Sequence, residues 1–391
     1  MAHTASCTRC SGRAKPGPRP GRVGRFPGQR VARRPTVLAV TRSPRFLVPV
    51  LAAALLAAGA LLGPAATAAP SAPGDPRPTA VVALGDSVAS GEGAGGYEPG
   101  TRGEVGDWCH RSPGAFVTRT GLADQAVNLA GSGASSADVR FGGSHDTEGS
   151  QAERLVDVAT RLRVTTVFVQ LGANDDAALV DTLGACVRAF LDITVPPCRT
   201  TLAPLVDARM AATATKMEAA VDDVRAAMRR AGYGDAGYQL VLLSYSSPVT
   251  ERMVGVPALI GCPFTRPDAG WGRTVLIPKL SAALSGVAGR TGARFVDMSR
   301  AAEGFEACSH GDSKAEWERR LTVSPDVFAH SGSHAVSYHL AQESFHPSAT
   351  AYGEFGHCLG EFVRGPLAAG ACVPAGGHLQ VQARAGTPVA A

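Results

Sequence analysis

Short apolar runs that alternate with helical patterns constrain the fold of this chain more than any other feature. The runs are continuous enough to form strands buried on both faces, and they lie at 79–84, 126–130, 166–171, 239–244 and 293–296. Apolar residues at three- and four-residue spacing predict helices over 151–162, 176–191, 204–231, 278–289 and 349–363. This alternation predicts an α/β chain, a three-layer α/β/α sandwich around a central parallel sheet of about five strands.

The first 69 residues have the pattern of a leader. Residues 1–45 contain eleven Arg and Lys residues and no acidic residue, and residues 46–62 are apolar and uncharged. With the small-residue site Ala66-Thr67-Ala68, these parts predict a secretory signal cleaved near Ala68/Ala69, and therefore a secreted protein. The alternative is a membrane anchor over 46–62, which is at the short limit for a span. The basic part is long for a signal, so translation could start further downstream.

We divide the rest of the chain into a Pro-rich linker at 70–78, one folded domain over 79–373, and a flexible tail at 374–391. Without the leader's eleven cations, 27 basic residues face 33 acidic ones. An acidic body repels a phosphate backbone, so we expect no nucleic-acid partner. We expect a monomer.

Four polar blocks carry the candidate chemistry: Gly85-Asp86-Ser87, Gly131-Ser132-Gly133, Gly172-Ala173-Asn174-Asp175 and Glu343-Ser344-Phe345-His346-Pro347. The first three follow apolar runs, and the fourth precedes the last helix. The carboxyl ends of parallel strands share one edge of a sheet, so we expect these blocks to converge there.

Acyl transfer is the chemistry that these residue types support. Ser87 is a nucleophile once a base removes its proton, and His346 is that base. The main-chain N–H groups of Ser87 and Gly133, with the Asn174 amide, would hold an oxyanion. The structural alternatives are a simple turn at Ser87 and a turn with a helix cap at Asn174-Asp175. We expect Asp86 to accept main-chain hydrogen bonds, and Asp175 or Asp176 to cap the helix that follows.

With these blocks in this order, residues 79–365 resemble the SGNH (GDSL) hydrolases, and more narrowly their secreted actinobacterial lipases and esterases. The resemblance implies a flavodoxin-like fold and a carboxylic ester hydrolase with an acyl-enzyme intermediate. We expect no cofactor, and we expect no metal because none of the cysteines after the leader forms a C-x-x-C pair. In that group a residue three positions before the histidine often orients it, through a carboxylate or through its main chain. Glu343 holds this position, so it is the candidate third catalytic residue and both modes stay open.

The resemblance also implies cysteine pairing. Of the nine cysteines, seven follow the leader. The pairs are Cys186–Cys198 and Cys262–Cys308, with Cys358–Cys372 paired by elimination. The family commonly bridges a cysteine at the position of Cys109 to one at the position of Gly131, so Cys109 is left free.

The substrate is a small-molecule or lipid ester, with at most transient contact with lipid interfaces. Fatty acyl esters are favoured by the apolar loop around 254–264. The alternatives are a carbohydrate acetylesterase of the same fold and an exported binding protein that has lost catalysis. A sugar site would need aromatic platforms, and the chain has only three tryptophans, Trp108, Trp271 and Trp317.

Overall fold

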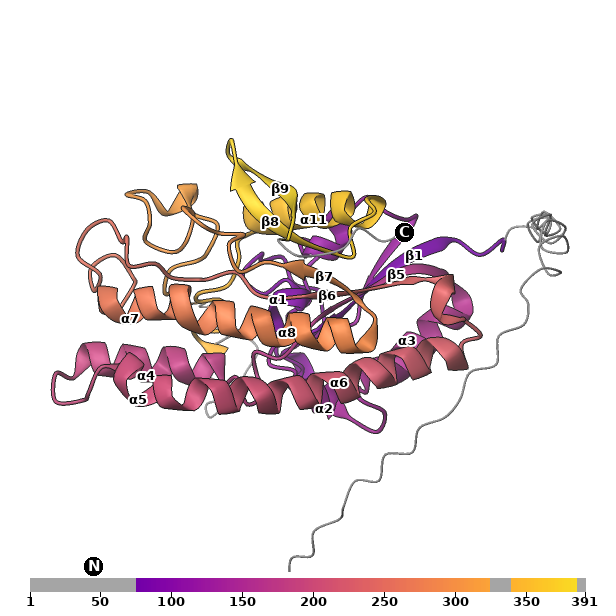
Figure 1. Ribbon diagram of the computed structural model, residues 1–391, viewed down its shortest axis with the longest axis horizontal. Coiled ribbons are helices and arrows are strands. Elements are labelled where there is room, and N and C mark those ends of the chain that lie inside the picture. Colours follow the sequence, from indigo (N-terminus) through magenta and orange to yellow (C-terminus); the bar gives the residue numbers. More distant parts are fainter. Residues whose placement is uncertain (1–74, 324–338, 385–391) are drawn as a thin grey trace, which may run out of the picture. The chain divides into compact units, whose positions relative to one another are not determined.

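The computed structural model describes residues 75–323 and 339–384 (Figure 1). The predicted leader, its cleavage site and most of the linker lie outside the described residues. Among the described helices, none has both the length and the apolar character needed to cross a membrane.

A seven-stranded sheet forms the centre of the described chain, in the order β2-β1-β5-β6-β7-β8-β9. All neighbouring strands are parallel except the last pair, β8 and β9. The strands are β1 (Thr79–Gly85), β2 (Gln125–Asn128), β5 (Arg163–Gln170), β6 (Gln239–Leu243), β7 (Arg294–Asp297), β8 (Ala369–Ala375) and β9 (His378–Ala383). A separate small hairpin joins β3 (Ser144–His145) to β4 (Glu148–Gly149).

Helices cover both faces of this sheet, which makes the predicted three-layer sandwich (Figure 1). One face carries α2 (Ser136–Val139), α3 (Gln151–Arg161), α6 (Val206–Arg230) and α8 (Ile277–Thr291), and the other carries α11 (Ala349–Arg364). Strand β1 shows why its sequence is apolar throughout. Val82 and Leu84 pack in the first core, whereas Val81 and Ala83 pack in the second. Both sets are buried, so no position along the strand can be polar without cost.

All five predicted strands and all five predicted helices are present. The predicted helix at 176–191 starts late, because α4 spans Leu179–Leu191 and its N-cap is Ala178, with no side-chain cap. The capping role expected of Asp175 or Asp176 was therefore wrong. The Asp175 carboxylate instead accepts hydrogen bonds from the N–H and hydroxyl of Ser136 (3.2 and 2.5 Å).

The expectation of a flexible tail from 374 onward was also wrong for residues 374–383, most of which lie in strands. Residues 378–383 form β9, which pairs with β8 through six residue pairs. The side chain of Leu379 is only 1% exposed, so apolar packing as well as hydrogen bonding holds this edge strand in place. Disulfide Cys358–Cys372 ties β8 to α11 and fixes the strand pair against the core.

Candidate active site

The nucleophile candidate Ser87 is the first residue of α1 (Ser87–Ser90), immediately beyond the end of β1. The turn between them requires glycine, because a Cβ atom on Gly85 would lie 1.9 Å from the main-chain oxygen of Gln170. Asp86 caps α1 by accepting a hydrogen bond from the N–H of Val88 (3.2 Å), which is the main-chain role expected of it. The loop thus presents Ser87 at the carboxyl edge of the sheet.

His346 is hydrogen-bonded to this serine. Its Nε2 lies 2.7 Å from Ser87 Oγ, and its Nδ1 lies 3.1 Å from the main-chain carbonyl oxygen of Ser344. A carbonyl oxygen can only accept, so Nδ1 carries the ring proton and Nε2 is left with a lone pair. The neutral ring is therefore in the tautomer that can take the proton of Ser87.

Main-chain pairing with a neighbouring segment holds the histidine loop in place. The N–H of Arg319 donates to the carbonyl of His346 (2.9 Å), and the N–H of Phe345 donates to the carbonyl of Arg319 (3.1 Å). Phe345 has a φ of 59°, a left-handed conformation that costs a non-glycine residue of order 1 kcal/mol. Such a conformation persists only where surrounding contacts enforce it, and here it sets the direction of the adjacent His346.

Glu343 does not contact the histidine ring by either route that the sequence left open. Its carboxylate accepts a hydrogen bond from Tyr97 (2.8 Å) and pairs with Arg319 (3.2 Å). The carbonyl that orients His346 belongs to Ser344, two positions before the histidine instead of three. Glu343 thus fixes the loop that carries the histidine, and the oriented pair consists of Ser87 and His346.

Sequence reasoning missed Glu92, a fully buried carboxylate on the nucleophile side of the site. It bonds to His110 (3.0 Å), to Tyr97 (2.8 Å) and to the Gln342 amide (2.9 Å). Burial alone would raise its pKa, but the His110 hydrogen bond and the positive charge of histidine hold the pKa of Glu92 below its ordinary value. A negative charge is thereby fixed near His346. A glutamate five residues after Ser87 was the only available signal, and its partner Gln342 lies 250 residues away in sequence.

The pKa of His346 is lowered, and burial is the main cause. The negative charges of Glu92 and Glu343 and the main-chain contact with Ser344 act in the opposite direction. A lowered pKa keeps the ring neutral at neutral pH, as a general base requires.

The oxyanion candidates Gly133 and Asn174 line the same cavity as Ser87 and His346. Among the described residues, none accepts a hydrogen bond from the main-chain N–H of Ser87 or of Gly133. The Asn174 amide donates one hydrogen to the carbonyl of Ala134 (3.0 Å), which fixes its rotamer and leaves its second hydrogen. The structure therefore brings these three donors and the Ser87–His346 pair into one cavity.

That cavity has a volume of about 490 Å³ and is mainly apolar in its walls. Helix α4 contributes Leu179, Leu183 and Val187, and Phe264 and Phe345 lie among the other walls. Its acidic lining residues are Asp146, Asp268 and Glu318, and there is no lysine or arginine among the described lining residues. Such walls suit an uncharged apolar chain better than an anion.

The six cysteines expected to pair do so in the structure, as Cys186–Cys198, Cys262–Cys308 and Cys358–Cys372. Cys109 is free and buried. Its thiol lies close to His145 and Asp146, and also to Asp107 and Glu148, so ligand atoms of metal-binding type meet there.

These groups already have partners. Glu148 bonds to Arg111 and Arg154, and burial raises the pKa of Cys109, which favours the protonated thiol. A protonated thiol, next to a carboxylate that two guanidinium groups already occupy, is a poor metal ligand.

The geometry thus defines an α/β/α protein with an activated serine at the carboxyl edge of its sheet. The profile of the GDSL-like lipase/acylhydrolase family matches residues 83–353, and the chain belongs to that family. It is accordingly a carboxylic ester hydrolase. No curated protein matches the chain.

Solved structures with a similar fold include other ester hydrolases. An extracellular lipase from Streptomyces rimosus is 22% identical with a TM-score of 0.43, over 71% of this chain and 97% of that one. Phospholipase A1 from Streptomyces albidoflavus NA297 is 21% identical with a TM-score of 0.46, over 70% and 94%. Est24, a carbohydrate acetylesterase from Sinorhizobium meliloti, is 13% identical with a TM-score of 0.34, over 73% and 98%.

Proposed function

We propose that the protein is a secreted lipase or esterase that hydrolyses fatty acyl esters through an acyl-enzyme at Ser87. The observation that carries the proposal is the 2.7 Å hydrogen bond between Ser87 Oγ and His346 Nε2, beside a largely apolar cavity. Three disulfides suit an oxidising compartment, and with the leader they support export.

In the first half of the reaction, His346 Nε2 takes the hydroxyl proton while Ser87 Oγ attacks the ester carbonyl carbon. The resulting oxyanion accepts hydrogen bonds from the N–H groups of Ser87 and Gly133 and from the Asn174 amide. When the tetrahedral intermediate collapses, the C–O bond to the alcohol breaks, and the alcohol leaves with the proton from Nε2. Water then gives a proton to His346 Nε2 as its oxygen attacks the acyl-enzyme carbonyl carbon. When this second tetrahedral intermediate collapses, the bond to Ser87 Oγ breaks, Ser87 takes the proton back from Nε2, and the carboxylic acid leaves.

A carbohydrate acetylesterase is the second candidate, because Trp108 and Trp271 both line the cavity. Trp108 stacks on His339 with ring centroids 4.0 Å apart, so part of the aromatic surface that a sugar could use is already covered. The predominantly aliphatic α4 wall favours acyl chains over sugars.

The test is hydrolysis of p-nitrophenyl esters from acetate to palmitate, beside acetylated xylan, by the protein starting at Ala69. We expect turnover of the longer esters, and its loss in Ser87→Ala. Turnover of acetate and acetylated xylan alone would select the acetylesterase. If the folded protein hydrolyses none of these esters, and Ser87 also does not react with a fluorophosphonate probe, both candidates are refuted.

A further inference from the structure

The segment from Met253 to Thr265 has an unusual combination of charge and exposure. It contains no Asp, Glu, Lys, Arg or His. Its ends are buried, with Met253 exposed to 3% and Phe264 to 1%, yet its middle turns aliphatic side chains into solvent. The most exposed of these are Val254 (50%), Val256 (59%) and Leu259 (84%). We call residues 254–260 the apolar tip.

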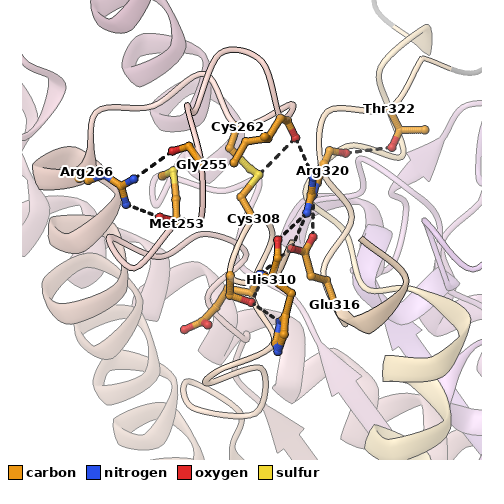
Figure 2. The surroundings of a disulfide bond; sticks show 12 residues. Met253, Gly255, Cys262, Arg266, Cys308, His310, Glu316, Arg320 and Thr322 are labelled. Carbon is orange, nitrogen blue, oxygen red and sulfur yellow. Dashed lines mark hydrogen bonds and ion pairs between the residues drawn. A yellow bond between two sulfur atoms is a disulfide. The ribbon is translucent and has the colours of Figure 1, made fainter. Parts of the chain in front are cut away.

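Hydrogen bonds and a disulfide hold the main chain at the two ends of the apolar tip (Figure 2). The Arg266 guanidinium donates to the carbonyls of Met253 and Gly255. On the other side, the Arg320 guanidinium donates to the carbonyl of Ile260 (3.3 Å). Disulfide Cys262–Cys308 anchors the C-terminal end of the tip to a second loop.

These clamps use main-chain carbonyls and leave the aliphatic side chains free. A loop already fixed in one conformation loses little further entropy when its tip enters another phase. A group of exposed apolar side chains of this kind is typical of a surface that binds a partner or a lipid phase.

The apolar tip is continuous with the mouth of the catalytic cavity. The N–H of Leu321 donates to the carbonyl of Gly261 (2.8 Å), directly after the tip. Leu321 is 47% exposed and also lines the cavity, so the residue that bonds to the segment after the tip is itself part of the cavity wall. Beneath the tip, Ile260 packs in the same cluster as Phe264 and Phe345, which are cavity walls. The tip thus shares an apolar cluster with two residues of the cavity wall.

We propose that the apolar tip inserts into the surface of aggregated lipid and so places the cavity mouth against that surface. The occupant is a lipid surface because the tip offers only uncharged aliphatic groups, and because the adjoining cavity takes its ester from the same phase. This extension rests on the proposed function only for the identity of the ester. Adsorption itself needs no catalysis. With no charge on the tip, adsorption depends on hydrophobic transfer and is insensitive to salt.

The test measures adsorption separately from catalysis. Ser87→Ala protein is sedimented with phosphatidylcholine vesicles, alone and with Val256→Asp and Leu259→Asp combined. Both tip residues are exposed, so the charges leave the core intact. The matched control is Val105→Asp, at a residue 88% exposed on another loop. We expect the tip variant to bind vesicles at least about tenfold more weakly, since two aliphatic groups no longer transfer, and the control to bind like its parent.

A second readout uses the active enzyme. The tip variant should hydrolyse soluble p-nitrophenyl acetate at the parent rate and emulsified triglyceride at least about tenfold more slowly. Equal vesicle binding by the tip variant and its parent would overturn the proposal, as would equal loss in the Val105→Asp control or adsorption that disappears in high salt. A dimer that dissociates in the tip variant, without vesicle binding, would assign the tip to a second copy of the chain. Vesicle binding by a protein that hydrolyses no ester would retain the tip and refute the proposed function.

Discussion

A cysteine introduced at position 131 should pair with Cys109 and stabilise the fold. A Cβ atom on Gly131 would lie 2.8 Å from Cys109 Sγ and 3.5 Å from Cys109 Cβ, and a disulfide needs Cβ atoms about 3.5–4.5 Å apart. Gly131 is not among the residues with positive φ, so its backbone accepts a side chain. The ring of His145, 2.9 Å from the new Cβ, must move by a few tenths of an ångström.

The new bond would close a loop of about 22 residues, for which the loss of chain entropy in the unfolded state corresponds to about 3 kcal/mol. Guanidinium unfolding of oxidised Gly131→Cys should show this gain. In the protein starting at Ala69, alkylation after denaturation should find no free thiol, whereas the parent protein has Cys109 free. Gly131→Ala is the control. Its Cβ meets the Cys109 sulfur without bonding to it, so it should be less stable than the parent. Two alkylated thiols in Gly131→Cys, or a formed bond without added stability, would refute the reasoning.

Three further variants test the site. Asn174→Ala should lower kcat by about 10²–10³ with little change in KM, because one oxyanion donor is lost, and a fall below tenfold would remove Asn174 from that role. Glu343→Gln should lower kcat by less than about tenfold in steady-state assays, because Nδ1 of His346 bonds to the carbonyl of Ser344 and not to the Glu343 carboxylate. A decrease in kcat of about 10⁴-fold would instead make Glu343 the triad acid. Burial raises the pKa of Glu318 to about 8, so the folded chain keeps a proton that the unfolded chain releases above its ordinary pKa of 4.5. The contribution of Glu318 to the free energy of unfolding therefore falls as pH rises. Between about pH 5 and pH 8, urea unfolding of Glu318→Gln should show a loss of free energy about 3 kcal/mol smaller than that of the parent. Equal losses of unfolding free energy in the two proteins over this pH range would contradict the prediction.

The sheet could be predicted from sequence where its strands are buried on both faces. Strand β1 places alternate residues in two different cores, and both demand apolar side chains, which leaves a continuous run. Strand β8 escaped notice because Gly370 and Pro374 interrupt its apolar residues. Its partner β9 alternates Leu379 and Val381 with polar residues, a period-two signal that was present but short. An edge strand such as β9, with only one face covered, needs fewer apolar residues and is therefore harder to predict from its sequence.

The sequence also allowed the proposed reacting groups, Ser87 and His346, to be predicted. Ser87 and His346 lie 259 residues apart in sequence, yet their blocks each end at the same edge of the sheet, and the hydrogen bond between them follows from the topology. The residues that hold this pair in place could not be predicted in the same way. Tyr97 donates to Glu343 and contacts Glu92, but the sequence does not mark it, because Glu343 lies 246 residues away on another loop.

The orientation of His346 shows why the residue type of its Nδ1 partner could not be predicted from the sequence. A carboxylate partner would leave an acidic residue as its signature, whereas the carbonyl of Ser344 would be present whatever side chain stood there. A neutral carbonyl also stabilises a positively charged ring less than a carboxylate does. The negative charges of Glu92 and Glu343 supply part of that stabilisation from a greater distance. Orientation and charge compensation, which a triad aspartate combines in one side chain, are thus divided here between a main-chain atom and two glutamates.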